Sequence, residues 1–196
     1  QLLAAVTDIP QQLYREPKHR AEIGRIIDQH GFVKGFELQF RRKDGSLLWI
    51  SLNARAIRDA GGAILHYEST LEDISERKQT EQELLRLATA VEQSTESVII
   101  TDLNGAIQYV NPACERITGF HRQELIGQQF DLILKGKDVP FSFKEITDKI
   151  SSVGVWTGRF SSHKKDNTLF AEEASISPIR NAAGQIISYI AINRDV

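Results

Sequence analysis

The sequence contains no methionine and only one cysteine among its 196 residues. A single cysteine excludes a disulfide bond within the chain and fits a reducing compartment, so we expect a cytoplasmic location. The missing methionine and a first residue that is glutamine indicate a piece of a longer protein. The parent protein could still be anchored in a membrane through another part.

Long apolar runs are missing as well. No run approaches the roughly 18 residues that a membrane span needs, and residues 1–10 lack the basic and apolar regions of a signal peptide. The net charge is −2, so neither sign of charge is in large excess. We therefore expect no contact with nucleic acid and no membrane contact in this segment.

Catalytic and metal-binding patterns are absent from the sequence. It has no serine–histidine–aspartate set, no phosphate-binding loop and no pair of catalytic acids. The histidines have no zinc-ligand spacing. They are His19, His30, His66, His121 and His163. The sequence thus predicts a segment that is not itself an enzyme and that binds no metal.

Residues 75–96 contain no glycine and no proline and are rich in strong helix formers. Ser75 is the expected N-cap. The apolar residues of this segment form a narrow stripe with coiled-coil spacing. They are Leu84, Leu87, Ala88 and Val91. We predict a connecting helix that docks or pairs along this one seam, and the stripe is a candidate cover for the outer face of a sheet.

Both flanks of this helix are rich in strand signals, and they repeat each other. Residues 43–74 align with residues 165–196 by a shift of 122 without a gap. The shift places Asp73 on Asp195 and Tyr67 on Tyr189. An ungapped match over two turns and two strands predicts two copies of one structural unit.

The second copy is the more complete one. Its pattern is two strands, a group of short helices and three further strands, over residues 97–103, 106–110, 113–118, 121–126, 140–153, 155–163, 168–180 and 185–194. This order predicts an α+β fold, a five-stranded antiparallel sheet with short helices on one face. The first copy shows a helix over residues 17–30 and three strands only.

Several motifs of the second copy closely resemble those of PAS domains, including the PAC motif of the family's second half. They occupy residues 107–113, 117–120, 124–127, 156–158, 165–166, 176–179 and 194–196. The resemblance is full over 88–196 and partial over 17–78. It implies a C-terminal part of a first PAS domain at 1–74, a connecting helix at 75–96 and a complete second PAS domain at 97–196.

The family resemblance implies a sensory and dimerisation segment of a signal-transduction protein. A two-component phosphorelay with a histidine kinase as output is expected, or less often a cyclic-dinucleotide enzyme such as a cyclase. The segment would form a homodimer, bind a small-molecule signal or a partner, and transmit it through the connecting helix. The residues expected to carry that transmission are Asp73, Leu84, Leu87, Val91 and Asp195.

Residues for a ligand pocket also follow from the resemblance. They are Asn111, Phe130, Ile146, Trp156 and Glu173. Trp156 resembles a tryptophan that neighbours the isoalloxazine ring in flavin-containing redox sensors of the family, although many PAS domains without flavin carry it too. Glu172 and Glu173 put one carboxylate on each face of a strand. One must face inward unless twist or a bulge takes it to the rim.

Two cofactor chemistries of the family are not expected. Phe130 stands where the light-sensing flavin branch carries its photochemical cysteine, and Cys114 lies elsewhere and suits a small core position. The helix at 140–153 lacks the axial histidine of haem-binding relatives. Three functions stay open: a sensor that transmits through the connecting helix, a redox sensor that binds flavin (FAD), and a structural dimerisation module without ligand.

Overall fold

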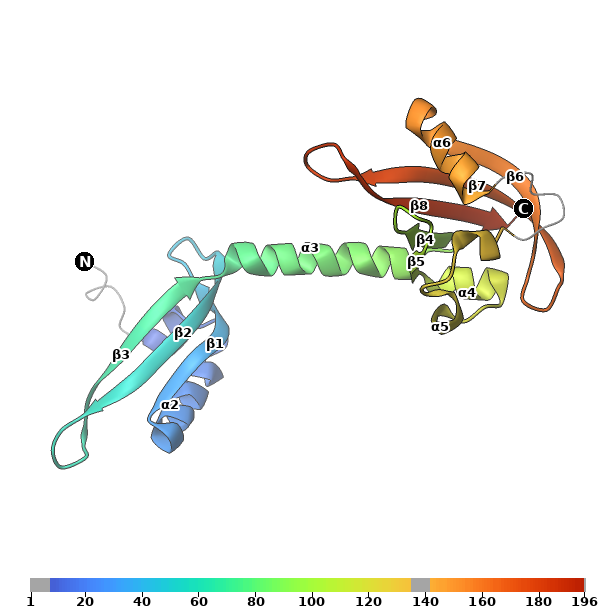
Figure 1. Ribbon diagram of the computed structural model, residues 1–196. Coiled ribbons are helices and arrows are strands. Elements are labelled where there is room, and N and C mark those ends of the chain that lie inside the picture. Colours follow the sequence, from blue (N-terminus) through green and yellow to red (C-terminus); the bar gives the residue numbers. More distant parts are fainter. Residues whose placement is uncertain (1–7, 135–141, 196) are drawn as a thin grey trace. The chain divides into compact units, whose positions relative to one another are not determined.

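Figure 1 shows the computed structural model of the chain, which describes residues 8–134 and 142–195. The chain divides into two compact units, Gln1–Leu85 (unit 1) and Arg86–Val196 (unit 2). The division falls within a single helix, α3 (Ser75–Glu92). Among the helices of the described residues, none is long and apolar enough to span a membrane.

Unit 1 is a three-stranded antiparallel sheet with one long helix on it. Its elements are α1 (Ile9–Gln12), α2 (Lys18–His30), β1 (Phe32–Arg41), β2 (Leu47–Arg58) and β3 (Ile64–Asp73). The strand order is β1-β2-β3. Figure 1 shows α2 along one face of the sheet. Ile23 and Ile27 of α2 pack there against Leu38, Ile50 and Leu52, which gives this small unit one apolar core.

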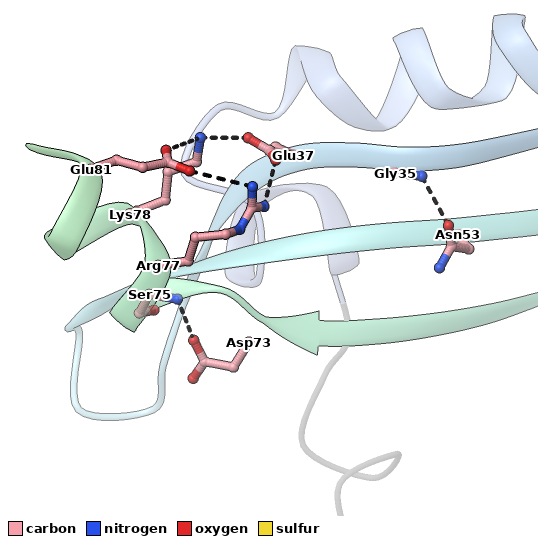
Figure 2. Close-up of polar contacts among 8 residues, drawn as sticks. All are labelled: Gly35, Glu37, Asn53, Asp73, Ser75, Arg77, Lys78 and Glu81. Atoms are coloured by element: carbon pink, nitrogen blue, oxygen red, sulfur yellow. Dashed lines mark hydrogen bonds and ion pairs between the residues drawn. The ribbon is translucent and has the colours of Figure 1, made fainter.

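A bulge interrupts β1 and requires a glycine. The register of β1 against β2 shifts between Val33 and Phe36. Gly35 lies in the shifted stretch with φ +65°, a backbone conformation that residues with a side chain rarely adopt. Its amide, which the bulge frees from the strand ladder, donates to Asn53 Oδ1 at 2.8 Å (Figure 2).

Unit 2 is a five-stranded antiparallel sheet with short helices. Its elements after α3 are β4 (Ser97–Thr101), β5 (Ile107–Val110), α4 (Pro112–Thr118), α5 (Arg122–Leu125), η1 (Phe130–Leu132), α6 (Phe143–Val153), β6 (Trp156–His163), β7 (Leu169–Arg180) and β8 (Ile186–Asp195). The strand order is β5-β4-β8-β7-β6, and every neighbouring pair is antiparallel. The predicted α+β fold class is therefore confirmed.

The repeat is also visible in the strand bounds. A shift of 122 carries Leu47–Arg58 of β2 onto Leu169–Arg180 of β7, and Ile64–Asp73 of β3 onto Ile186–Asp195 of β8. The order of the three strands in the two sheets agrees as well. Unit 1 thus repeats the second half of unit 2, with α2 in the place of α6 before the first of the three strands.

Two helix ends differ from the expected ones. The start expected at residue 140 lies outside the described residues, and α6 begins at Phe143 behind a capping box in which Ser142 and Glu145 bond to each other's amides. The connecting helix ends at Glu92 instead of residue 96. A local bond from the Glu96 amide to Ser94 Oγ, at 3.1 Å, replaces a further helical turn.

Candidate functional site

Helix α3 has an exposed middle. None of its residues is buried, and the stripe residues Leu84 and Leu87 are 62 % and 54 % exposed. Leu85, which the stripe did not include, is 68 % exposed. Leu84 is therefore not buried by the rest of unit 1, and Leu87 is not buried by the rest of unit 2. The structure instead fixes α3 by contacts close to its two ends.

The start of α3 is hydrogen-bonded to the end of β3, as Figure 2 shows, and it is also bonded to β2. Asp73 Oδ1 accepts from the Ser75 amide at 2.9 Å, and Ser75 Oγ accepts from the Trp49 amide at 3.0 Å. The Ile74 amide donates to the Trp49 carbonyl at 2.9 Å. Ser75 is thus not the predicted N-cap, because its hydroxyl satisfies a strand amide of β2. We name this set of bonds the start anchor.

Charged side chains extend the start anchor along the first turn of α3. Glu37 of β1 pairs with Arg77 Nη2 and with Lys78 Nζ, each at 2.6 Å, and Lys78 Nζ also lies 3.2 Å from Glu81 (Figure 2). The ammonium group of Lys78 stands 5.5 Å from the centre of the Trp49 ring. The hydrogen bonds from Lys78 and Arg77 lower the pKa of Glu37 below its ordinary value. The first turn is therefore tied to β1 as well as to β2.

The end of α3 is held by one buried amide side chain in unit 2. Asn111 is fully buried, and its Oδ1 accepts from the amides of Val98 and Cys114 at 2.9 and 3.1 Å. Its Nδ2 donates to the carbonyls of Val91 and Glu96 at 3.1 and 2.9 Å. Asn111 is also the N-cap of α4, followed by Pro112 at the first helical position. We name this group the end anchor.

A second contact closes the end anchor at Glu92. Tyr109 of β5 donates from Oη to Glu92 Oε1 at 2.6 Å. The Arg122 guanidinium lies 4.9 Å from the centre of the Tyr109 ring and 4.0 Å from the Glu92 carboxylate. Burial and the neighbouring Glu92 carboxylate raise the pKa of Tyr109 to about 12. The last residue of α3 is therefore bonded to β5 by a phenol that keeps its proton at neutral pH.

The residues expected to line a ligand pocket lie in the core of unit 2, with one exception. Phe130, Ile146 and Trp156 belong to one buried cluster, and Asn111 is fully buried beside it. The cluster also contains the rings of Phe143 and Tyr189. A flavin ring stacked against Trp156 would require the side chains packed there to move.

Trp156 and Gly158 form one packing unit. An ideal Cβ built on Gly158 would lie 2.4 Å from Cη2 and 2.6 Å from Cζ2 of Trp156. The indole therefore lies over the bare backbone of Gly158, two residues further along the same face of β6. Its ring centre is 6.3 Å from that of Phe160. The tryptophan–any residue–glycine pattern is explained here by packing, without a ligand.

Glu173 is the exception among the predicted pocket residues, and the prediction was wrong about which glutamate faces inward. Glu173 is exposed and lies 3.9 Å from Arg159. Glu172 is buried and lies on the inner face of β7 with Phe170, Ala174 and Ile176. Residues two apart in a strand lie on the same face, so the apolar residues at 170, 174 and 176 were the sequence signal that Glu172 faces inward.

Glu172 is part of a buried polar group that crosses the sheet. Its carboxyl group is hydrogen-bonded to the hydroxyl of Ser162 on β6, and it accepts from Asn193 Nδ2 on β8 at 2.8 Å. Among the described residues, Asn193 Oδ1 is buried and has no hydrogen-bond partner. Burial, the largest effect, raises the pKa of the Glu172 carboxyl group above its ordinary value. The fold therefore favours the protonated form of Glu172.

We expect Glu172→Gln to change the pH dependence of stability. A raised pKa means that the stability contributed by the protonated carboxyl group is complete below its unfolded-state pKa and is lost as the pH rises through the folded-state pKa. The variant should therefore be more stable than the parent chain at about pH 8 and should gain no such advantage at about pH 4. Urea unfolding at both pH values, followed by Trp156 fluorescence in a Trp49→Phe background, measures this.

The control for this prediction is Glu173→Gln, because Glu173 is the exposed neighbour on the opposite face of β7. It should leave the difference between the two pH values unchanged. If the free energy of unfolding depended on pH equally in the parent chain and in Glu172→Gln, Glu172 would not be the group that lowers stability at high pH.

The remaining residues expected in transmission occupy the anchors or the strand ends. Val91 supplies a carbonyl to the end anchor, and Asp73 belongs to the start anchor. Asp195 ends β8 at the position equivalent to Asp73 and is exposed. Among residues 8–134 and 142–195, no three metal-ligating side chains come together. The arrangement can hold a helix at both ends, and we see no catalytic geometry in it.

The sequence and the structure of the chain were compared with those of known proteins. The sequence profile of the family described as "PAS domain" matches residues 6–76 and 95–196. The chain is 26 % identical to the crystal structure of a PAS domain from Colwellia psychrerythraea, with a TM-score of 0.54 over 58 % of this chain and 97 % of that one. The family match includes residues of both units, and the structural match covers a little more than half of the chain.

The chain is also similar to curated proteins that are named as a signal transduction kinase, a sensor and a regulatory protein. The chain is 37 % identical over 112 residues to hybrid signal transduction histidine kinase L of Dictyostelium discoideum, which is 57 % of this chain and 6 % of that protein. It is 30 % identical over 135 residues to the sensor protein FixL of Bradyrhizobium diazoefficiens, 65 % of this chain and 26 % of that protein. A nitrogen fixation regulatory protein of Klebsiella oxytoca is 28 % identical over 108 residues, 55 % of this chain and 22 % of that protein. The chain thus spans only a small part of these relatives.

Proposed function

The chain belongs to the PAS domain family and is similar to parts of a signal transduction histidine kinase and of a sensor protein. We therefore propose that it is a sensory segment whose helix α3 transmits a conformational change from one unit to the next. PAS domains are generally sensory modules without catalytic activity, and the segment itself catalyses nothing on this proposal. The output is a histidine kinase in another part of the whole protein, as the name of one similar protein suggests.

The observation that carries this proposal is the way α3 is held. The start anchor bonds Ser75 and its neighbours to β2 and β1. The end anchor bonds Val91 and Glu92 to the side chains of Asn111 and Tyr109. The middle of the helix contains no buried residue. A helix is stiff because its backbone groups are bonded internally. A rotation or shift imposed at one anchor therefore reaches the other and is not absorbed by packing between them.

The exposed stripe supports a homodimer as part of the same proposal. Leu84, Leu87 and Val91 have the spacing of one coiled-coil seam, and Leu84 and Leu87 remain more than half exposed. Pairing with α3 of a second copy would remove this apolar surface from water. A flavin cofactor is not part of the proposal, because the predicted pocket side chains pack against one another.

We expect deletion of Gln82 to uncouple the segment from its output in the whole protein. Removing one residue turns everything after it by about 100° relative to the start anchor and shortens the helix by about 1.5 Å. Each unit should still fold, because residue 82 is exposed and belongs to neither core. The measurement is the difference in autophosphorylation of the whole kinase with and without the stimulus. In the deletion variant this difference should disappear.

Insertion of seven residues after Gln82 is the matched control. Seven residues restore the phase of the helix to within about 20°. Signalling should return in this variant although the helix is longer by about 10 Å. Normal signalling after the one-residue deletion would reduce α3 to a tether. An altered signal in both variants would assign the effect to helix length.

A further inference from the structure

Glu172 is a buried carboxyl group that the proposed transmission through α3 does not use. It lies on the inner face of β7 and is only 1 % exposed. The two side chains hydrogen-bonded to it, Ser162 of β6 and Asn193 of β8, are buried as well. The carboxyl group is therefore shielded from bulk water, and its charge state depends on the groups packed around it.

The two partners of Glu172 suit the neutral form of its carboxyl group. A protonated carboxyl group has one O–H donor and one carbonyl oxygen that accepts. A hydroxyl oxygen can accept as well as donate, so Ser162 offers an acceptor for the O–H. Asn193 Nδ2 donates to the other oxygen, Oε2, at 2.8 Å. Both polar groups of the protonated acid thus have a matching partner.

The ionised form of Glu172 has no counter-ion. Two titratable groups of other elements act on it, Asp195 of β8, directly opposite in the sheet, and Cys114 of α4. Besides burial, the largest effect, the negative charge of Asp195 raises the pKa of Glu172, and burial raises the pKa of the Cys114 thiol, which stays neutral. Among the described residues no basic side chain contributes to the environment of Glu172. Ionisation therefore favours a rearrangement that brings water or another donor to the carboxylate.

Asn193 carries the polar atom that such a rearrangement would use. Its Oδ1 is buried and has no hydrogen-bond partner within the described part of the chain. A water molecule that enters beside the ionised carboxylate can donate one bond to this oxygen and one to the carboxylate. Ionisation of Glu172 therefore acts on both ends of the Asn193 amide group.

Asn193 also lies next to the end anchor of α3. In the sheet it stands directly opposite Ser97 of β4. Both chain neighbours of Ser97 are bonded to Asn111. The Val98 amide donates to Asn111 Oδ1 at 2.9 Å, and the Glu96 carbonyl accepts from Asn111 Nδ2 at 2.9 Å. A displacement of Asn193 that moves Ser97 therefore changes bonds that hold the end of α3.

We propose that unit 2 is a proton sensor with Glu172 as its proton-binding group. The neutral carboxyl group leaves the hydrogen bonds of the end anchor in place. As the pH rises, Glu172 loses its proton to water, and the rearrangement around Asn193 and Ser97 weakens those bonds. This inference rests on the transmission proposed for α3, because it names the stimulus that the end anchor passes on.

The test follows amide hydrogen exchange of the whole chain by NMR between about pH 4 and pH 9. Rates are expressed as protection factors, which correct for the intrinsic pH dependence of exchange. The reporters are the amides of Gln93, in the last bond of the helix, and of Val98. Their protection should fall about tenfold as the pH rises, with the midpoint at which the carboxyl carbon of Glu172 titrates. The Ile107 amide of β5, bonded away from this path, should keep its protection.

Two substitutions identify the group that titrates. Glu172→Gln supplies a neutral side chain of the same shape, and the protection of both reporters should stay at its low-pH value over the whole range. Asp195→Asn removes the neighbouring negative charge, so the midpoint should move to lower pH. Asp195 is exposed, and this variant should fold normally. The matched control is Glu173→Gln on the outer face of β7, which should leave the midpoint unchanged.

Two results would overturn the proposal. One is constant protection of the reporters across the pH range in the parent chain. The other is a fall in protection that persists in Glu172→Gln, because another group would then be responsible. The deletion of Gln82 tests the transmission separately. Constant protection in the parent chain together with lost signalling in that deletion variant would refute the proton sensor and leave the transmission through α3 standing.

Discussion

Asn111→Ala is expected to lower the free energy of unfolding of unit 2 by about 4 kcal/mol. The substitution removes four hydrogen bonds of a fully buried side chain. It leaves two amides, of Val98 and Cys114, and two carbonyls, of Val91 and Glu96, without this partner. Each such loss costs roughly 1 kcal/mol or more when water cannot replace the bond. It also removes the N-cap of α4, which is worth about 1 kcal/mol alone.

Two measurements separate the effect on stability from the effect on α3. Urea unfolding followed by Trp156 fluorescence in a Trp49→Phe background gives the stability of unit 2. Amide hydrogen exchange at residues 91–96 reports the end of the helix, and we expect faster exchange there even where unit 2 remains folded. A loss of stability without faster exchange at these amides would mean that Asn111 supports the core of unit 2 but does not hold α3.

Asn111→Asp and Asn104→Ala serve as controls. The aspartate keeps both accepted bonds and loses the two donated ones, and it faces the carbonyls of Val91 and Glu96 with a negative charge. It should therefore preserve the start of α4 while still releasing the end of α3. Asn104 is an exposed turn residue, and its replacement should cost no more than about 0.5 kcal/mol.

Gly158→Ala is the second substitution with a large expected effect, a loss of about 2 kcal/mol of stability in unit 2. The added methyl group would lie 2.4 Å from Trp156 Cη2, well inside van der Waals contact. Gly158 does not have a positive φ, so the backbone accepts alanine and the cost comes from the indole alone. The ring must leave its position, and the fluorescence maximum of Trp156 should shift as well as the urea midpoint.

A double mutant identifies the cause. Trp156→Leu removes the ring that the methyl group would meet, so Gly158→Ala should cost little in that background. Gly24→Ala in α2 is the matched substitution with nothing within 4 Å of the new methyl group. It should be neutral or stabilise unit 1 by up to about 1 kcal/mol. Additive effects of Trp156→Leu and Gly158→Ala would contradict the packing explanation.

Much of the fold could be predicted from the sequence because it depends on local patterns. The turn residues, the alternation along the strands and the ungapped repeat located β2, β3, β7 and β8, and the resemblance to PAS domains indicated the five-stranded sheet. These signals are carried by residues close together in the chain. The strand bounds of the repeat agree in the two units for that reason.

The candidate site was harder to predict, because its residues meet only in the folded chain. Ser75 has the composition and position of an N-cap, but its hydroxyl is taken by the Trp49 amide from another strand. Asn111 was predicted to line a ligand pocket, whereas the structure uses all four of its bonds to join α3, β4 and α4. The choice of Glu173 over Glu172 as a pocket residue has a different origin. Phe170, Ala174 and Ile176 alternate along β7 on the same face as Glu172, and this alternation is visible in the sequence.

The two anchors of α3 differ in the physical nature of their bonds. The start anchor includes exposed ion pairs of Glu37 with Arg77 and Lys78, whereas the central residue of the end anchor is a neutral amide shielded from water. Dissolved ions screen exposed charges over about 8–10 Å and barely reach a buried neutral group. Ionic strength therefore acts on α3 chiefly from one end. The start anchor therefore weakens as the ionic strength rises, whereas in the end anchor only the exposed Arg122–Glu92 pair is screened and the buried bonds of Asn111 persist.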